Sequence, residues 1–251
     1  MRAQERLDGR TALVTGGARG IGRACAEWLA AAGASVTVLD RETEEAHAVA
    51  TAIGGRAVVA DLSDVDSIDS WGLSADILVN NAGIQHVAPV EAFPPDTFAL
   101  MLRLMVEAPF RLARACLPGM YANGWGRIVN ISSVHGVRAS PFKSAYVTAK
   151  HALEGLSKVL ALEGAPHGVT SNCVNPAYVR TALVEKQIAA QAAQHGIAEA
   201  DVIEKIMLEP AAIKRLIEPA EVAELVTYLC GESASFITGA SIMVDGGWSV
   251  H

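Results

Sequence analysis

Cysteine is scarce in this chain, and the four that occur are far apart. No two of them form a C-x-x-C pair, and none has a histidine at metal-ligand spacing, so the pattern favours neither a zinc site nor a disulfide framework. We therefore expect reduced, buried thiols, no bound metal and a cytoplasmic location. The four residues are Cys25, Cys116, Cys173 and Cys230.

Long apolar runs and long runs of one charge are also missing. Although 51% of the residues are hydrophobic, glycines and charged residues interrupt every apolar segment before the ~20 residues that a membrane-spanning helix needs. The opening MRAQERLDGR lacks the apolar centre of a secretory signal. The formal net charge of −7 argues against nucleic acid, whose phosphates favour clustered Lys and Arg. Neither a membrane nor a nucleic acid is an expected partner.

The chain instead alternates short apolar runs with longer amphipathic segments. Strand, helix, strand repeated in this way predicts an α/β fold, a Rossmann-type doubly wound parallel sheet of about seven strands with helices on both faces. No linker, repeat or low-complexity tract divides the 251 residues, so residues 1–251 are expected to form a single domain. The predicted strands are TALVTG, ASVTVLD, RAVVAD, DILVNNAG, GRIVNIS, VTSNCVNP and SIMVDGG.

Two segments depart from this regular alternation. Residues 61–76, DLSDVDSIDSWGLSAD, leave room for only a short helix, so one face of the sheet is expected to be thinly covered there. Residues 181–209 insert Ala-rich, mostly helical sequence between a strand end and the helix predicted over 219–230. Because ligands bind at the carboxyl ends of strands in open α/β sheets, this insertion is well placed to act as a small helical lid.

The first predicted strand runs into a glycine-rich turn, TGGARGIG, and then into a helix. Such a turn lets backbone N–H groups at the helix start approach a pyrophosphate. Asp40 ends the next strand, at the ~20-residue offset expected of a carboxylate that binds the adenosine ribose. Such a carboxylate repels a 2′-phosphate, which favours NAD over NADP. Alternatively, Asp40 is a solvated acid, and Arg41 next to it could partly offset the repulsion.

At this point the sequence resembles the short-chain dehydrogenase/reductase family. The glycine spacing, DL, NNAG and the later Y-x-x-x-K occur in the family's order across nearly the whole chain. NPAYVRT is similar to the stretch that backs the nicotinamide, although Ala177 replaces the usual glycine. The resemblance implies that NAD is bound by Thr15, Gly16, Arg19, Gly20, Ile21, Gly22, Asp40, Asp61, Leu62, Asn81, Ala82, Gly83, Tyr146, Lys150, Pro176, Val179 and Thr181.

Tyr146 and Lys150 are four residues apart and therefore share one face of a helix. A nearby ammonium favours the phenolate, so we expect Lys150 to lower the pKa of Tyr146 toward the range of a general base. The family resemblance implies that Ser133 orients and polarises the substrate oxygen, that Tyr146 is the acid/base, and that Lys150 also holds the nicotinamide ribose. A solvated helix face is the alternative for this pair.

One member of the family's catalytic set is missing. Much of the family has an asparagine in the preceding long helix, where this chain has Met105. Methionine cannot replace an amide, but Pro109 four residues later has no N–H, so the carbonyl of Met105 loses its helical partner. The hypothesis is that this carbonyl holds a relay water for Lys150, and the alternative is a simple kink.

Four polar positions resemble a subfamily, the D-3-hydroxybutyrate dehydrogenases, whose pocket grips a short carboxylate. They are Gln85, His135, Lys143 and Gln187, and each by itself could be an ordinary surface residue. A lysine charge with amide and imidazole hydrogen bonds suits a carboxylate. The resemblance implies reversible, NAD-dependent oxidation of (R)-3-hydroxybutyrate to acetoacetate, a small anionic substrate, and a homotetramer.

Other functions stay open from the sequence. An NADP-linked 3-oxoacyl thioester reductase is the nearest alternative, and another short-chain alcohol dehydrogenase is also compatible. Asp40 argues against the NADP cofactor, and a thioester has no carboxylate to grip. A catalytically vestigial nucleotide-sensing protein is a third possibility, because the asparagine is replaced by Met105.

Overall fold

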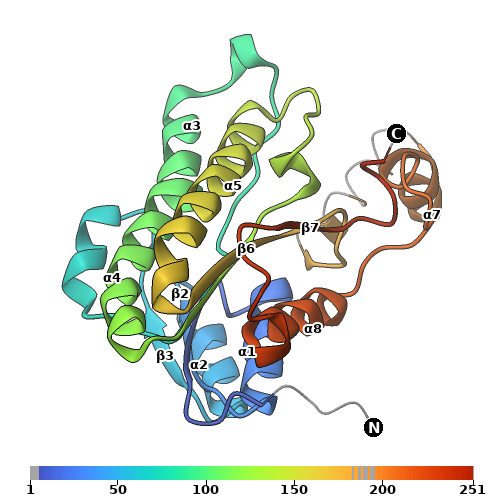
Figure 1. Ribbon diagram of the computed structural model, residues 1–251. Coiled ribbons are helices and arrows are strands. Elements are labelled where there is room, and N and C mark those ends of the chain that lie inside the picture. Colours follow the sequence, from blue (N-terminus) through green and yellow to red (C-terminus); the bar gives the residue numbers. More distant parts are fainter. Residues whose placement is uncertain (1–5, 183, 186–187, 189–191, 193–195, 251) are drawn as a thin grey trace, which may run out of the picture.

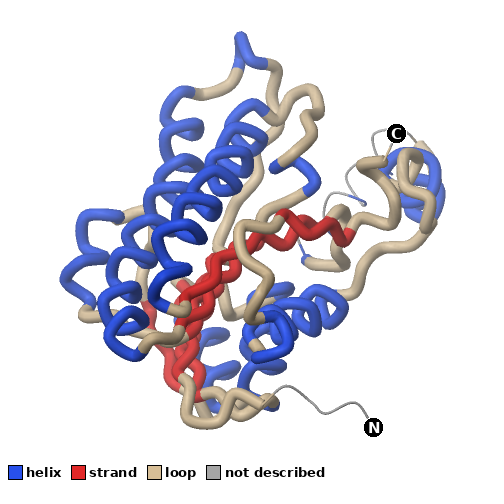
Figure 2. The backbone as a smooth tube through the Cα atoms, viewed as in Figure 1, coloured by secondary structure: helices blue, strands red, loops and turns tan. Residues whose placement is uncertain are grey.

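Seven strands form one parallel sheet in the computed structural model, which describes residues 6–182, 184–185, 188, 192 and 196–250 (Figures 1 and 2). The sheet order is β3-β2-β1-β4-β5-β6-β7, and all neighbouring strands are parallel. The predicted doubly wound sheet is confirmed. In chain order the strands are β1 (Thr11–Thr15), β2 (Ser35–Asp40), β3 (Arg56–Val59), β4 (Ile77–Asn80), β5 (Gly126–Ile131), β6 (Val169–Pro176) and β7 (Ser241–Val244).

Helices cover both faces of this sheet (Figure 1). One face carries α1 (Gly20–Ala31), α2 (Thr43–Ala52) and α8 (Pro219–Cys230). The other carries α4 (Ala108–Asn123) and α5 (Ser144–Gly164), with α3 (Pro95–Leu102) packed beside α5. Short 3₁₀ turns connect these elements: η1 (Val65–Trp71), η2 (Val90–Ala92), η4 (Val134–Gly136), η5 (Ala165–His167) and η7 (Glu232–Ala234).

Two apolar cores lie on opposite sides of the sheet. On β1, Leu13 and Val14 are neighbours in sequence but contribute to different cores, as period-two alternation requires. Because both faces are covered, consecutive apolar residues fill the middle of β1 and most of β4. Strand β6 instead buries four polar residues, Thr170, Ser171, Asn172 and Asn175. The chain visits β1, β2 and β3 and then crosses back to β4, so a crevice opens where the strand order reverses.

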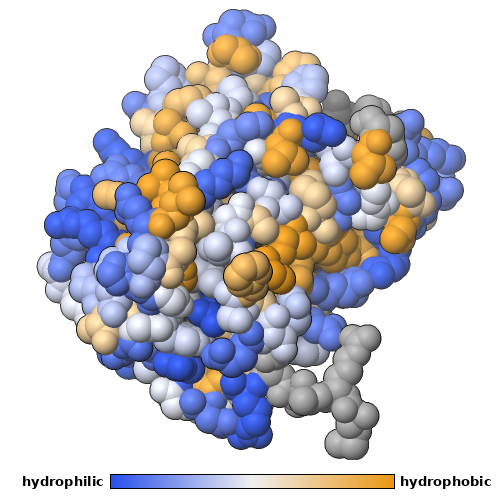
Figure 3. All heavy atoms as spheres, viewed as in Figure 1, coloured by the Kyte–Doolittle hydropathy of each residue, from blue (hydrophilic) through white to orange (hydrophobic). Residues whose placement is uncertain are grey.

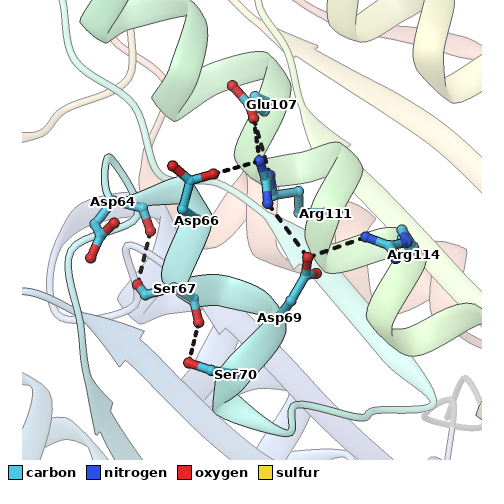
Figure 4. A network of polar contacts seen from close by, with 8 residues as sticks. All are labelled: Asp64, Asp66, Ser67, Asp69, Ser70, Glu107, Arg111 and Arg114. Atoms are coloured by element: carbon cyan, nitrogen blue, oxygen red, sulfur yellow. Dashed lines mark hydrogen bonds and ion pairs between the residues drawn. The ribbon is translucent and has the colours of Figure 1, made fainter.

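The segment 61–76 holds only the 3₁₀ turn η1, as its length predicted. A charged network fixes this turn to α4 (Figure 4). Arg111 of α4 contacts Asp66 at 2.9 Å and Asp69 at 3.4 Å, and it also pairs with Glu107 at 2.8 Å. Arg114 adds a second contact to Asp69 at 3.2 Å. The network therefore joins this segment to the long helix.

A π-helical turn, η3 (Arg103–Glu107), joins α3 to α4. The N–H of Ala108 donates to the carbonyl of Arg103, five residues back. Pro109 has no N–H for the carbonyl of Met105, and a widened turn is one way in which a helix accommodates a missing donor. Helical structure continues from α3 through this turn into α4, and the relay water at the Met105 carbonyl stays a prediction.

The region after Thr181 forms a small apolar cluster apart from the two main cores. Ile188, Val202, Met207 and Leu208 are buried in it, and Trp248 packs against them. Its regular elements are α7 (Glu199–Val202) and the π-helical turn η6 (Ile203–Met207). Within the helical lid predicted over 181–209, residues 182, 184–185, 188, 192 and 199–207 are helical, whereas 181, 196–198 and 208–209 are not. Closure of this segment over a ligand stays a prediction.

The structure also bears on the cysteines, on membrane-spanning helices and on metal-ligating side chains. All four cysteines are buried and unpaired, as expected. Across the described ranges no helix combines the length and apolarity that crossing a bilayer requires, and no cluster of His, Cys, Asp and Glu has the arrangement of a metal site.

Leu112 on α4 is fully buried in the core that α4 forms with the sheet. Leu112→Ala should lower the free energy of unfolding by about 2–5 kcal/mol, because the truncation leaves a cavity in a tightly packed layer. Denaturation in guanidinium chloride measures this. Arg114→Ala, on the same helix with a side chain 64% exposed, should leave the transition nearly unchanged, and equal losses in both variants would contradict the assigned packing.

Candidate active site

A cavity of about 610 Å³ opens at the carboxyl ends of the strands. It is walled by residues that directly follow β1, β4, β5 and β6, where the strand order reverses. Within the described part of the chain, the predicted site residues line this cavity with the exception of Thr15 and Gly22. Gln187 lies outside the described residues. The structure thus brings the predicted cofactor, catalytic and substrate positions to one place.

The glycine-rich turn leaves the start of α1 open to this cavity. Gly16 and Gly20 have positive φ values of 60° and 54°, a conformation that other residues rarely adopt. No side chain caps the helix at Arg19, so its first N–H groups are free for an anion. A Cβ on Gly22 would lie 2.1 Å from the carbonyl oxygen of Gly16. These features fit a dinucleotide pyrophosphate.

Thr15 and Gly22 support the cavity from behind rather than lining it. The Thr15 hydroxyl accepts hydrogen bonds from the N–H of Asn81 at 2.9 Å and of Ala82 at 3.1 Å. The Asn81 amide in turn donates to the carbonyls of Thr15 and Gly16. Asn81 of NNAG therefore holds the glycine-rich turn in place. Thr15 and Gly22 do not line the cavity, and their predicted role in binding the cofactor stays a prediction.

Asp40 lines the cavity, and its carboxylate also organises the backbone. Its oxygens accept from the N–H of Ala18 at 3.0 Å and of Glu42 at 3.1 Å. Each carboxylate oxygen has a second lone pair, so a ribose hydroxyl can still donate to it. The structure therefore keeps Asp40 in place for the predicted ribose contact.

Asp61 and Leu62 line the same end of the cavity. The Asp61 carboxylate accepts from the N–H of Ser63 at 2.8 Å, and this bond lowers the pKa of Asp61. Leu62 is 5% exposed and packs into the core beneath. A charged acid and an apolar side chain thus stand side by side where an adenine is expected.

The three predicted catalytic residues come from two elements. Ser133 follows β5, while Tyr146 and Lys150 lie one turn apart on α5. Lys150 is 4% exposed and donates to the carbonyl of Ile131 at 2.7 Å. Its Nζ lies 5.6 Å from the centre of the Tyr146 ring. Helix α5 is thereby fixed to the end of β5, with Tyr146 facing the cavity.

The protonation chemistry differs from the sequence-based expectation. Burial raises the pKa of Tyr146, and a hydrogen bond with Ser133 offsets this only in part. Burial also lowers the pKa of Lys150, to about 8. Lysine therefore does not by itself bring the phenol into the range of a general base in the protein without ligands. An oxidised nicotinamide bound in this cavity would add a positive charge, which favours the phenolate.

His135 and Lys143 stand beside the catalytic residues, as predicted. The His135 ring nitrogens lie 3.4 Å from the Ser133 hydroxyl and 2.9 Å from that of Ser140. Burial and then the charge of Lys143 lower the pKa of His135 to about 4, so the imidazole is neutral at neutral pH. Lys143 Nζ lies 5.9 Å from the centre of the Tyr178 ring, and burial lowers its pKa.

Trp248 and Tyr178 are cavity residues that the sequence reasoning missed. The rings of Trp248 and His135 are 5.8 Å apart, and Arg138 donates to the carbonyl of Ser249 at 2.7 Å. Trp248 follows β7, so the rule that sites form at strand ends could have identified it. Tyr178 follows β6 in the same way.

Met105 packs beside the catalytic helix. Its side chain is 1% exposed and belongs to a cluster that includes Ala145, Ala149 and Tyr146. A Cβ on Gly83 would lie 3.2 Å from its sulfur. The methionine thus fills space between NNAG and α5, and its side chain offers only a weak sulfur acceptor for a proton relay.

Known proteins resemble this chain over nearly its whole length. The family model described as "Enoyl-(Acyl carrier protein) reductase" matches residues 16–249. D-beta-hydroxybutyrate dehydrogenase of Rhizobium meliloti (strain 1021) is 42% identical over 96% of this chain and 99% of its own. The protein of the same name from Cupriavidus necator is 41% identical over 96% and 98%.

Solved structures agree with this relationship. L-Sorbose reductase from Gluconobacter frateurii, complexed with NADPH and L-sorbose, has a TM-score of 0.92 at 30% identity, covering 99% of this chain and 100% of its own. Together with the fold and the cavity, these similarities define an oxidoreductase that uses a nicotinamide dinucleotide. The chain belongs to the short-chain dehydrogenase/reductase family.

The pKa of Lys150, about 8, predicts how activity depends on pH. Lys150 is charged below that value and neutral above it, so a step that needs the ammonium should weaken as the pH rises through about 8. The measurement is kcat/KM for alcohol oxidation from pH 6 to pH 10. Lys150→Arg keeps a charge throughout this range, so its residual activity should lack this alkaline limb, and an unchanged limb would assign it to another group.

Proposed function

We propose that this protein catalyses the reversible, NAD-dependent oxidation of (R)-3-hydroxybutyrate to acetoacetate. The observation that carries the proposal is the ammonium of Lys143 in the cavity wall, close to Tyr146. No carboxylate pairs with it among the residues that the structure describes. A half-buried cation without a counter-ion is costly, and an organic acid would supply the missing charge.

The side chains around the cavity have different roles in this reaction. Lys143 binds the substrate carboxylate, and Gln85 and neutral His135 supply directional hydrogen bonds. Ser133 donates to the substrate oxygen and holds it beside Tyr146. Tyr146 accepts the hydroxyl proton in oxidation and returns it in reduction. The bound nicotinamide supplies the hydride acceptor. Gln187 is proposed to complete the carboxylate grip.

Charges around the ribose end support NAD rather than NADP. A 2′-phosphate needs a free cation near Asp40. Arg19 pairs with Glu45 and lies 3.6 Å from Glu42, and Arg41 lies 3.5 Å from Glu42. Both arginines are therefore engaged by carboxylates, which together with Asp40 would repel a phosphate. The solved L-sorbose reductase, in contrast, is complexed with NADPH, so the family fold alone does not decide the cofactor.

Each alternative function would need a different site. A 3-oxoacyl thioester reductase would leave Lys143 without a carboxylate partner, although the matching family model describes an acyl carrier protein reductase. A nucleotide sensor without chemistry is compatible with Met105, yet it gives no reason to keep Ser133, Tyr146 and Lys150 together.

A homotetramer in the cytoplasm is proposed as the working form. Large apolar side chains are exposed on the long helices, with Phe110 of α4 and Val159 of α5 each 50% exposed and Leu162 of α5 79% exposed. Figure 3 shows apolar patches among polar side chains on one face of the molecule. Covering such positions with a second copy would remove them from water.

Purified protein should oxidise (R)-3-hydroxybutyrate with NAD and much more slowly with NADP. Absorbance of the reduced nicotinamide at ~340 nm measures both reactions. Tyr146→Phe should bind NADH but lose at least about 100-fold in kcat, as expected when a positioned acid/base is removed. Tight NAD binding without turnover of any short hydroxy acid would favour the sensor.

Lys143→Ala should raise the apparent KM for 3-hydroxybutyrate by about 10- to 100-fold, because a charge-assisted hydrogen bond to the carboxylate is lost. The KM for NAD should change little. Lys158→Ala, an exposed lysine on α5, is the matched control and should resemble the unmodified protein. Equal effects on both KM values would remove Lys143 from the carboxylate site.

A further inference from the structure

Behind the catalytic residues lies a buried acid that the mechanism does not use. Glu154 follows Lys150 by one turn of α5 and is 4% exposed. Tyr146, Lys150 and Glu154 are spaced four residues apart and share one helix face. A buried carboxylate is costly unless it is partnered, so its surroundings should show what it does.

Glu154 accepts hydrogen bonds from two strands. The amide of Asn175 on β6 donates to one oxygen at 2.6 Å, and the hydroxyl of Ser241 on β7 donates to the other at 2.5 Å. The same Asn175 amide donates to the main-chain carbonyl of Ser133 at 2.9 Å. Glu154 therefore reaches the catalytic serine through one intermediate side chain.

The loop that carries Ser133 also rests directly on this acid. A Cβ on Gly136 would lie 2.8 Å from a carboxylate oxygen of Glu154 and 2.4 Å from the Ser132 hydroxyl. Only glycine fits there without displacing one of them. The loop backbone is thus seated on Glu154, between α5 and the ends of β5 and β6.

Electrostatics connect the same acid to Lys150. Burial lowers the pKa of Lys150, and negative charge at Cys173 and Glu154 opposes that effect. The pKa of the Cys173 thiol is about 12, so it is uncharged near neutrality. His135, on the turn packed against α5, is neutral as well. Glu154 is the carboxylic acid among the described groups that raise the pKa of Lys150, and both of its oxygens accept hydrogen bonds.

We propose that Glu154 is a positioning residue of the active site, which seats the Ser132–Gly136 loop through Asn175 and keeps the Lys150 ammonium charged beside Tyr146. Both effects, on the position of the loop and on the charge of Lys150, come from the carboxylate of Glu154. The proposal rests on the proposed roles of Ser133, Tyr146 and Lys150, but not on the identity of the substrate.

The test measures Lys150 directly in the full chain without cofactor or substrate. The sequence contains only six lysines, so the ¹³Cε signals of labelled lysine can be followed against pH by NMR, with Lys150→Arg used for assignment. Glu154→Gln keeps an acceptor for Asn175 and a partner for Ser241 but removes the charge. Lys150 should then lose its proton at a pH lower by on the order of one unit.

Two further variants sharpen the result. Glu163→Gln, at an exposed position on the same helix, should leave the titration of Lys150 unchanged. Glu154→Asp keeps the charge and should titrate closer to the unmodified protein than Glu154→Gln does. Coincident Lys150 titrations in Glu154→Gln and the unmodified protein would overturn the proposal. If the glutamine variant does not fold, a Lys150 titration shifted downward by about a full unit in the aspartate variant would do the same.

A kinetic readout separates this inference from the substrate proposal. In Glu154→Gln the alkaline limb of kcat/KM should move to lower pH together with the Lys150 titration, for whichever alcohol the enzyme oxidises. Failure to oxidise 3-hydroxybutyrate would count against the proposed substrate alone, because the NMR titration needs no turnover.

Discussion

The hydrogen bond from the Lys150 ammonium to the carbonyl of Ile131 is the constraint on which the site depends. It joins the middle of α5 to the end of β5 at 2.7 Å in a buried setting, where a lost partner would leave a charge unsatisfied. Tyr146, one turn earlier on α5, is thereby set opposite Ser133, which follows β5. The loop after β5 supplies one reactive group and the helix the other, and this bond acts together with the packing of α5 on β6 and η4 to set their relative position.

The two ends of the cavity differ in charge. Around Asp40 the carboxylates of Glu42 and Glu45 engage both nearby arginines, whereas the opposite end holds the cations of Lys143 and Lys150. The proposed NAD, with its unphosphorylated ribose, and the proposed anionic substrate would bind at these two different ends. The overall charge of −7 conceals this local polarity, which arises only when distant segments meet at the strand ends.

The fold followed from the sequence because doubly covered parallel strands leave a strong apolar signal, and all seven strands were predicted. The positions of Ser133, Tyr146 and Lys150 also followed, since their spacing is local. The side-chain packing around the site did not follow from the sequence. Sequence spacing did not reveal that Thr15 and Gly22 lie behind the cavity wall, nor that burial raises the pKa of Tyr146. Glu154 was missed because its partners Asn175 and Ser241 are remote in the sequence, whereas the position of Trp248 after β7 could have identified it.

The contact between Arg138 and the carbonyl of Ser249 spans 111 positions of the chain, and it has a consequence for the order of folding. The wall formed by Trp248 exists only after β7 has docked at the edge of the sheet. The cavity is therefore incomplete until the last strand and the residues after it have joined the sheet.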